Sequence, residues 1–354
     1  YTVGIKTDGS LYIWGNNNVG QFGDTTVAST VVRSSPVQLG TGSFSQITTG
    51  INTSAAIKSD NTLWAWGLNS NGALGLGDTA NRSSPVQVGT SFWSKISTRD
   101  YMAGITSDYR LFAWGSNAGY QLGDGTTTPR SSPVQIGTSS YTSVSTGGSY
   151  MSAIRVDGGL FIWGTNTNGQ LGLGDTLLRS QPTQIASLTG LTVDNVSSPT
   201  QIGTSSWSKI SASKITNFVF GIQSNNTLYA WGINSFSQLG LGDSLSRSSP
   251  VQIGTGSWNS VSAGGSHSLG IDSNNNLYAW GNNNLGQTAN NGLVVSWTFI
   301  IAGRANTLTA SYAIRSDGML FSWGSGTSGQ LGQSDIVSRS SPVQIGTNSW
   351  ISVT

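Results

Sequence analysis

The sequence predicts an all-β repeat fold, of the kind found in propellers and solenoids, from three observations. A Trp-Gly pair recurs seven times, at intervals of 43 to 68 residues. A tight-turn pattern precedes every pair. The composition includes 48 Gly and only 8% charged residues, with Ser, Thr and Asn filling much of the rest. A period near 50 residues indicates a repeat architecture, and this composition favours strands over helices. The repeated tryptophans, which we interpret as structural, are Trp14, Trp66, Trp114, Trp163, Trp231, Trp280 and Trp323.

Each repeat contains a predicted β-hairpin just before its Trp-Gly pair. Asp-Gly and Asn-containing pairs accept positive φ and are typical of two-residue hairpin loops. Tyr109 fits this pattern least well, because a bulky side chain tolerates positive φ poorly. The seven predicted turn pairs are Asp8-Gly9, Asp60-Asn61, Asp108-Tyr109, Asp157-Gly158, Asn225-Asn226, Asn274-Asn275 and Asp317-Gly318.

A Gly or Ala followed by Ile precedes every turn, as in Gly4-Ile5 and Ala56-Ile57. A side chain no larger than a methyl group at the same place in all repeats indicates a crowded position, which we expect near the central axis of a propeller. After the turn, apolar side chains alternate with period two, as they do in strands.

A second aromatic set precedes a short Ile- or Val-containing strand in each repeat. Large aromatics between stacked sheets bury much apolar area, so we interpret the set as core rather than as a ligand-stacking or light-sensing site. Its members are Phe44, Trp93, Tyr141, Trp207, Trp258, Trp297 and Trp350.

The two chain ends are expected to supply two parts of one blade, about four residues short of a full repeat. The C-terminal SWISVT supplies the aromatic strand, and the N-terminal YTVGIKTDGSLYIWG supplies the hairpin. Pairing of the first and last strands closes a ring and removes the exposed sheet edges of an open array.

The strings GTNTNGQLGLGDTLLRSQPTQI (164–185) and GINSFSQLGLGDSLSRSSPVQI (232–253) resemble the repeat of the regulator of chromosome condensation family. The resemblance covers essentially the whole chain. It implies a seven-bladed β-propeller of four-stranded antiparallel blades, and one domain over residues 1–354. Members of this family include an exchange factor for a small GTPase, an ultraviolet receptor and an inhibitor of β-lactamases, so the family predicts the fold better than the activity.

Two regions depart from the repeat. An insertion near 186–199 extends the fourth-to-fifth interval and is either an interaction loop or an idle product of repeat slippage. The sixth repeat, near 282–310, has lost its consensus, which we interpret as drift rather than as a docking patch. The candidate interaction residues of the insertion are Leu188, Leu191, Val193, Asp194 and Asn195.

Asp and Arg recur together in six loops, beginning with Asp24/Arg33 and Asp78/Arg82. The pairs form either a ring of charge that binds a partner or, as we favour, loop caps with local ion pairs of little energetic value. His267 is the single histidine and there is no Cys, so a serine triad or a zinc site is not indicated. We therefore expect no catalytic, cofactor-binding or metal-binding residues, no cofactor, and no enzyme activity.

The net charge is +2 and the basic residues are scattered, which argues against nucleic-acid binding. No stretch is long and apolar enough for a membrane span.

The surface, poor in charge and rich in Ser, Thr and Asn, suggests a phage or virus virion protein (capsid decoration or host recognition) or a surface-displayed adhesion propeller. The expected partners are then capsid, tail or host-surface proteins, which multiple copies of this chain on one particle would contact. The expected location is a virion, the extracellular space or the cell surface, with the cytoplasm as an alternative. The alternative functions are a GTPase-regulating propeller and a secreted enzyme inhibitor.

Overall fold

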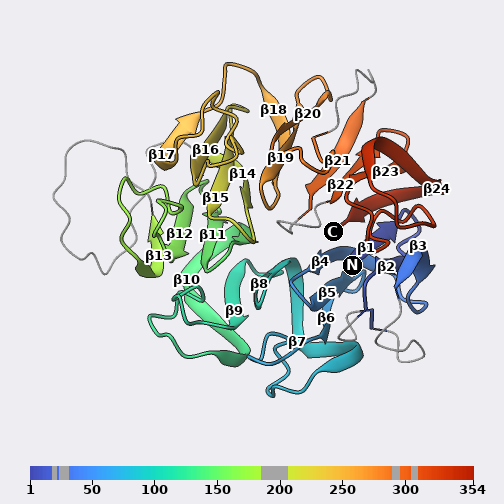
Figure 1. The fold of residues 1–354 in the computed structure, drawn as a ribbon. Coiled ribbons are helices and arrows are strands. Elements are labelled where there is room, and N and C mark those ends of the chain that lie inside the picture. Colours follow the sequence, from blue (N-terminus) through green and yellow to red (C-terminus); the bar gives the residue numbers. More distant parts are fainter. Residues whose placement is uncertain (18–21, 24–31, 185–205, 289–295, 304–309) are drawn as a thin grey trace.

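A computed structural model describes residues 1–17, 22–23, 32–184, 206–288, 296–303 and 310–354. Within these ranges the chain forms 24 β-strands and no helix. Figure 1 shows the strands arranged in groups around a centre, with both chain ends near the middle. Seven groups of antiparallel strands form seven blades, which confirms the predicted β-propeller.

Each blade is read from its innermost strand outward. The first three blades share the long strands β7, β10 and β24 with neighbouring blades. Blade 1 contains the end of β24 (Arg339–Val353), then β1 (Thr2–Lys6), β2 (Leu11–Gly15) and β3 (Arg33–Gln38). Blade 2 contains β4 (Phe44–Thr49), β5 (Thr53–Lys58), β6 (Thr62–Gly67) and the start of β7 (Arg82–Thr98). Blade 3 contains the end of β7, then β8 (Tyr101–Thr106), β9 (Arg110–Gly115) and the start of β10 (Arg130–Thr146).

The remaining four blades follow the same order, and blade 6 has three strands among the described residues. Blade 4 contains the end of β10, then β11 (Tyr150–Arg155), β12 (Leu160–Gly164) and β13 (Arg179–Gln184). Blade 5 contains β14 (Trp207–Ala212), β15 (Phe218–Gln223), β16 (Leu228–Gly232) and β17 (Arg247–Gln252). Blade 6 contains β18 (Trp258–Ala263), β19 (His267–Asp272) and β20 (Leu277–Gly281). Blade 7 contains β21 (Trp297–Ala302), β22 (Ala310–Arg315), β23 (Met319–Gly324) and the start of β24.

The chain ends share blade 1, as the sequence predicts. Strand β24 pairs antiparallel with β1, with Val353 opposite Gly4. Two backbone hydrogen bonds continue the pairing, from the Val3 amide to the Thr354 carbonyl at 3.0 Å and from the Thr354 amide to the Val3 carbonyl at 2.8 Å. Because β24 and β1 pair with each other, neither chain end leaves an open sheet edge at this place.

Hydroxyl groups join successive blades around the central channel. In each of four blades, an inner-strand Ser accepts a hydrogen bond from a backbone N–H of the next blade, at 2.9 to 3.2 Å. The donor and acceptor pairs are Thr146 to Ser97, Ala212 to Ser145, Ala263 to Ser211 and Ala302 to Ser262. Ile301 occupies the corresponding place in β21, so this side chain has no hydroxyl to offer the following blade.

The hairpin loops differ from the predicted two-residue type. Only the second residue of each predicted pair has positive φ, for example Gly9 at 83° and Tyr109 at 69°. The Gly9 amide donates to the Lys6 carbonyl at 2.9 Å, which closes a turn one residue earlier. This is the longer hairpin loop, in which a tight turn is followed by one left-handed residue.

The small residue before each Ile is crowded, although by an aromatic side chain rather than by the central axis. A Cβ added to Gly4 would lie 2.7 Å from Cζ3 of Trp350, and one added to Gly221 would lie 2.4 Å from Cζ3 of Trp207. The inner-strand aromatic therefore packs flat on the second strand of the same blade. A Gly or Ala is needed there because no larger side chain fits beneath the ring.

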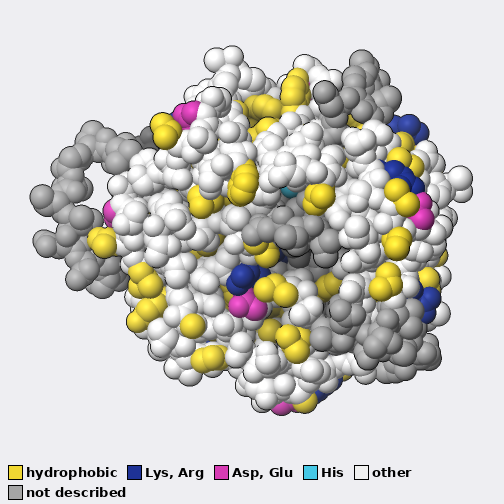
Figure 2. Space-filling view, in the orientation of Figure 1, with side chains coloured by type: hydrophobic (Ala, Val, Ile, Leu, Met, Phe, Trp, Pro, Cys, Tyr) yellow, Lys and Arg dark blue, Asp and Glu magenta, His cyan; other side chains and the backbone are white. Residues whose placement is uncertain are grey.

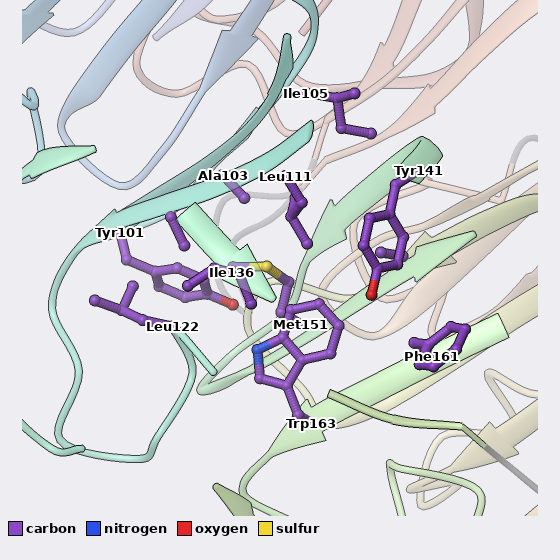
Figure 3. Close-up of a cluster of buried hydrophobic side chains, with 12 residues drawn as sticks. Tyr101, Ala103, Ile105, Leu111, Leu122, Ile136, Tyr141, Met151, Phe161 and Trp163 are labelled. Atoms are coloured by element: carbon purple, nitrogen blue, oxygen red, sulfur yellow. The ribbon is translucent and has the colours of Figure 1, made fainter. Parts of the chain in front are cut away.

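The core lies between neighbouring blades. Figure 3 shows one of its clusters, in which Tyr101, Leu122 and Ile136 of blade 3 and its loop face Met151 and Trp163 of blade 4. All five side chains are at most 1% exposed. No helix in the described ranges is long and apolar enough to cross a membrane.

Candidate protein-interaction face

The two ends of the ring carry different kinds of loop. The antiparallel order of the strands places the loops that follow each Trp-Gly pair at the same end as the loops that join the two innermost strands of each blade. We call this the loop end. The Asp-Gly and Asn-containing hairpins lie at the opposite end of each blade, which we call the hairpin end.

The Trp-Gly tryptophans hold the loops of the preceding blade in place. In five blades the indole Nε1 donates to the backbone carbonyl of the Gln in the preceding loop, at 2.7 to 3.0 Å. In four of these blades the residue two places after that Gln is a Gly that packs against the same indole, and a Cβ added to Gly123 would lie 2.5 Å from Nε1 of Trp163. The recurrent Gln-Leu-Gly and Trp-Gly motifs are thus two halves of one contact between blades.

The Asp and Arg of each loop form a local clamp, which supports the capping interpretation over a partner-binding ring of charge. In blade 5, Asp243 accepts a hydrogen bond from the Leu245 amide at 3.0 Å and pairs with Arg247 at 2.6 Å. The Leu245 amide and then the Arg247 guanidinium hold the pKa of Asp243 below its usual value. The same arrangement recurs around Asp78, Asp175 and Asp335. Asp24 lies outside the described residues.

The clamp holds the backbone of residues whose apolar side chains are exposed. Arg247 donates to the Leu245 carbonyl at 2.6 Å, so both backbone polar groups of Leu245 are satisfied within the loop. The Leu245 side chain is 65% exposed. Leu177 and Val337 are held in the same way and are 51% and 55% exposed.

Further exposed apolar side chains lie in the same loops of blades 4, 5 and 7. They are Leu178, Phe236 and Ile336. The clamped position in blade 2 is the small Ala80. The equivalent position in blade 3 is Thr126. The clamped position is therefore apolar in blades 4, 5 and 7 and small or polar in blades 2 and 3. Figure 2 shows few charged side chains in its view of the molecule.

His267 lies at the start of β19 and is fully buried. Its Nε2 lies 3.0 Å from Oγ of Ser311, and Nδ1 has no hydrogen-bond partner among the described residues. Burial lowers the pKa of His267 to about 4, because the interior disfavours the charged form. Within the described ranges, no group of three or more His, Cys, Asp or Glu side chains could hold a metal ion.

The candidate interaction residues Leu188, Leu191, Val193, Asp194 and Asn195 lie outside the described residues. The clamped apolar residues were not singled out by sequence reasoning. A usable pattern was present, since a large apolar residue stands two places after the loop Asp in three repeats, whereas the first three repeats have Thr26, Ala80 and Thr126 there.

Solved structures with the same fold include two of Prp20 from yeast. In the structure of Kap60 bound to yeast RCC1 (Prp20), the TM-score is 0.80 at 17% identity, and the match covers 97% of this chain and 85% of that one. In the Saccharomyces cerevisiae Prp20p structure, described with its binding properties to Gsp1p and histones, the TM-score is 0.81 at 17% identity over 98% and 88% of the two chains. Human WBSCR16 matches with a TM-score of 0.74 at 17% identity, over 98% and 93%.

These comparisons contradict the expectation of a virion or surface-displayed protein, together with its capsid and tail partners and its location. The finding that overturns it is the match to Prp20 and WBSCR16 over almost the whole chain. The expectation was wrong because low charge and a Ser-, Thr- and Asn-rich surface affect solubility without selecting a partner.

The sequence itself is 34% identical over 82 residues to the ultraviolet-B receptor UVR8 of Arabidopsis thaliana, a match that spans 22% of this chain and 18% of the receptor. The family profile of the regulator of chromosome condensation (RCC1) repeat matches residues 8–57, 60–98, 108–154, 157–213, 225–271 and 317–354. A second profile of the same repeat matches residues 44–73 and 258–287. The chain belongs to the regulator of chromosome condensation (RCC1) repeat family.

Proposed function

We propose that this chain is a non-catalytic propeller that binds and regulates a small GTPase through the loop end of blades 4, 5 and 7. The observation that carries the proposal is the clamped set Leu177, Leu245 and Val337, whose side chains are more than half exposed. A loop backbone that is already held by hydrogen bonds loses little conformational freedom on binding, and exposed apolar side chains favour protein interfaces.

Two further observations support this proposal. Prp20p, which shares the fold, was studied for its binding to the GTPase Gsp1p. The side chains that form clamps at the loop end are already engaged in local pairs, as Asp175 is with Arg179 at 2.6 Å. We propose that the seven repeats act as one domain over residues 1–354, in which the Trp-Gly tryptophans support the loops and contact no ligand.

The test is a nucleotide-release assay. Gsp1p loaded with a fluorescent GDP analogue is mixed with the full chain and excess unlabelled nucleotide. We expect release to accelerate at least about fivefold, the low end of typical coupling between two binding equilibria. Absence of both acceleration and complex formation would contradict regulation of a GTPase of this type.

The loop end is tested by a double variant, Leu177→Ser with Leu245→Ser. We expect the concentration for half-maximal acceleration to rise roughly tenfold or more, because central apolar contacts commonly contribute above 1 kcal/mol each. The matched control is Val156→Ser, an apolar residue of the hairpin end that is 55% exposed. If Val156→Ser weakens binding and the double variant does not, the proposed face is wrong.

A further inference from the structure

Blade 6 is shorter in sequence than blade 5 in the interval that supplies the outer strand. Nine residues separate Gln287, in the loop after β20, from Trp297, the first residue of blade 7. Nineteen residues separate Gln238, the equivalent residue after β16, from Trp258, the first residue of blade 6. The longer interval contains the six-residue outer strand β17. The interval after Gln287 therefore has ten residues fewer where blade 5 has its fourth strand.

The outer edge of β20 presents backbone groups that an outer strand satisfies elsewhere. In blade 5 the amide of Ile253 donates to the carbonyl of Leu228 at 2.8 Å. Leu277 is the equivalent residue of β20, and its carbonyl accepts no hydrogen bond from an outer strand in the ranges that the structure describes. Alternate residues of an antiparallel strand face the same neighbour, so Ala279 also turns its backbone groups outward. Such a row of N–H and C=O groups is a template for another strand.

Apolar side chains beside this edge are uncovered as well. Trp258, the inner aromatic of blade 6, is partly buried, whereas the equivalent aromatic of every other blade is at most 6% exposed. Trp258 packs edge to face on Tyr278, with ring centroids 5.2 Å apart, and Tyr278 is 45% exposed. An added strand would remove apolar area of both rings from water, which favours its binding.

Blade 6 also differs in charge at this edge. In four blades the second strand ends in a Lys or Arg that lies over the aromatic ring of the third strand, as Lys6 lies 3.6 Å from the ring centroid of Tyr12. In blade 6 the second strand ends in Asp272, and the ring is Tyr278, whose hydroxyl donates to Oδ2 of Asp272 at 3.2 Å. No Lys or Arg of the described chain pairs with Asp272. A carboxylate and an exposed ring are complementary to a cation from an incoming chain.

The outer strands of this chain show which kind of segment fits the edge. Strand β17 reads Arg-Ser-Ser-Pro-Val-Gln, and its Val lies opposite the Ala and its Gln opposite the Tyr of the Leu-Tyr-Ala-Trp-Gly strand β16. In blade 1 the hydroxyl of Tyr12 donates to Oε1 of Gln38 at 3.4 Å, so a side chain at the Gln position reaches the end of the opposite ring. Because β20 repeats the sequence of β16, the same register applies to it.

We propose that the outer edge of β20 is a docking site for an extended segment of a partner protein, which adds antiparallel as the fourth strand of blade 6. The segment has an apolar residue opposite Ala279 and a Lys or Arg opposite Tyr278, where the cation reaches Asp272. Main-chain hydrogen bonds supply affinity in such strand addition, and alternate side chains supply specificity. The edge uses none of the loop residues proposed to contact a GTPase, so either proposal can fail without the other.

The first experiment is a fluorescence-anisotropy titration of the full chain against a labelled synthetic peptide with the sequence of residues 248–254 and the change Gln252→Lys. We expect saturable binding. A methyl group on the amide nitrogen of peptide residue 253 should weaken binding about tenfold, because this amide faces β20 and the methyl group removes a hydrogen bond and adds a clash. The matched control is a methyl group on the amide nitrogen of residue 252, which faces away and should leave binding unchanged. Equal affinities of the two methylated peptides would overturn strand addition.

The charge of the segment is tested by a second peptide that carries Gln252→Asp. It should bind at least about threefold more weakly than the Gln252→Lys peptide, as expected for an exposed ion pair. Asp272→Asn in the full chain should abolish this preference while the peptides still bind. A preference that survives in Asp272→Asn would overturn the assignment of a basic segment.

The edge itself is tested by Tyr278→Ala, which should weaken binding of the Gln252→Lys peptide about fivefold through the loss of a cross-strand contact. The matched control is Tyr229→Ala, the same residue of the identical strand β16, whose outer edge is already paired; it should bind like the unchanged chain. Thermal melting shows that both variants are folded. The proposal is overturned if the unchanged chain binds neither peptide, or if sedimentation shows a dimer of the chain that Tyr278→Ala dissociates, because a second copy would then occupy the edge.

Discussion

Strands β16 and β20 have the same five residues, Leu-Tyr-Ala-Trp-Gly, and different surroundings. In β16 all but the Tyr are buried, whereas in β20 the Tyr is exposed and the other four residues are only partly buried. The outer strand β17 pairs with β16, with Val251 opposite Ala230. No strand among the described residues pairs with the outer edge of β20. Identical local sequence therefore specifies the strand, and the neighbouring strand decides how much area it buries.

The largest expected difference between the two blades is in the free energy of unfolding after loss of the Trp-Gly indole. Trp231→Ala should cost about 3–5 kcal/mol, as for a large buried aromatic, and Trp280→Ala about 1–3 kcal/mol, because Trp280 is already partly exposed. Each indole donates one hydrogen bond to a Gln carbonyl, so both substitutions remove the same hydrogen bond and differ only in lost packing. Urea denaturation of both variants measures the difference, and equal midpoints would show that β20 is as well packed as β16.

The next effect concerns the first residue of the second strand, Phe218 in blade 5 and His267 in blade 6. The pKa of His267 is about 4 in the folded chain, against a usual value of 6.5. The unfolded chain therefore gains a proton first, and stability should fall as the pH drops from about 6.5 to about 4, by on the order of 3 kcal/mol.

His267→Phe, which copies blade 5, should remove this dependence. Because His267 is the single histidine, the slope in this window has no other histidine source. Asp carboxyls stabilised by hydrogen bonds, such as Asp157 with a pKa of about 2 held down by Arg155, lose their contribution mainly below this window. An unchanged slope in His267→Phe would rule out His267 as the cause.

The smallest effect tests the crowded Gly beneath the inner aromatic. A Cβ at residue 221 would lie 2.4 Å from Trp207, and one at residue 270 would lie 2.5 Å from Trp258. Gly221→Ala should cost about 1–3 kcal/mol, as overpacking does in a tight core. Gly270→Ala should cost less because Trp258 is only partly buried and has room to move. Thermal melting of the pair checks this order, and a larger loss for Gly270→Ala would contradict it.

Much of the fold could be predicted from short-range patterns. The Asp-Gly and Asn-containing pairs mark all seven hairpins, and the aromatic before each inner strand marks the core. The predicted length of the hairpin loops was wrong. A residue with positive φ is needed both within a two-residue loop and after the tight turn of a longer loop, so the Asp-Gly and Asn-containing pairs fit either length. The small residue before Ile was correctly identified as crowded, but its neighbour, such as Trp350 beside Gly4, lies on another strand that the pattern does not name.

The candidate site was less predictable. The clamp at Leu245 uses an Asp and an Arg within four residues, so its capping role follows from the sequence, whereas the outward position of Leu245 depends on the folded loop. The insertion near 186–199, which is either an interaction loop or an idle product of repeat slippage, lies outside the described residues, so both alternatives stay open.

By itself, the sequence determined what one repeat is: its strands, its turns and the places where only a small or a large aromatic residue fits, because these depend on neighbours a few positions away. The tertiary structure alone decided what the repeats do to each other. Arg99 and Lys214, 115 residues apart, meet only because the ring brings distant blades to one channel. The two Leu-Tyr-Ala-Trp-Gly strands share a sequence and differ in burial, and among the described residues an outer strand pairs with only one of them. Burial therefore belongs to the assembled sheet rather than to the residues that form it.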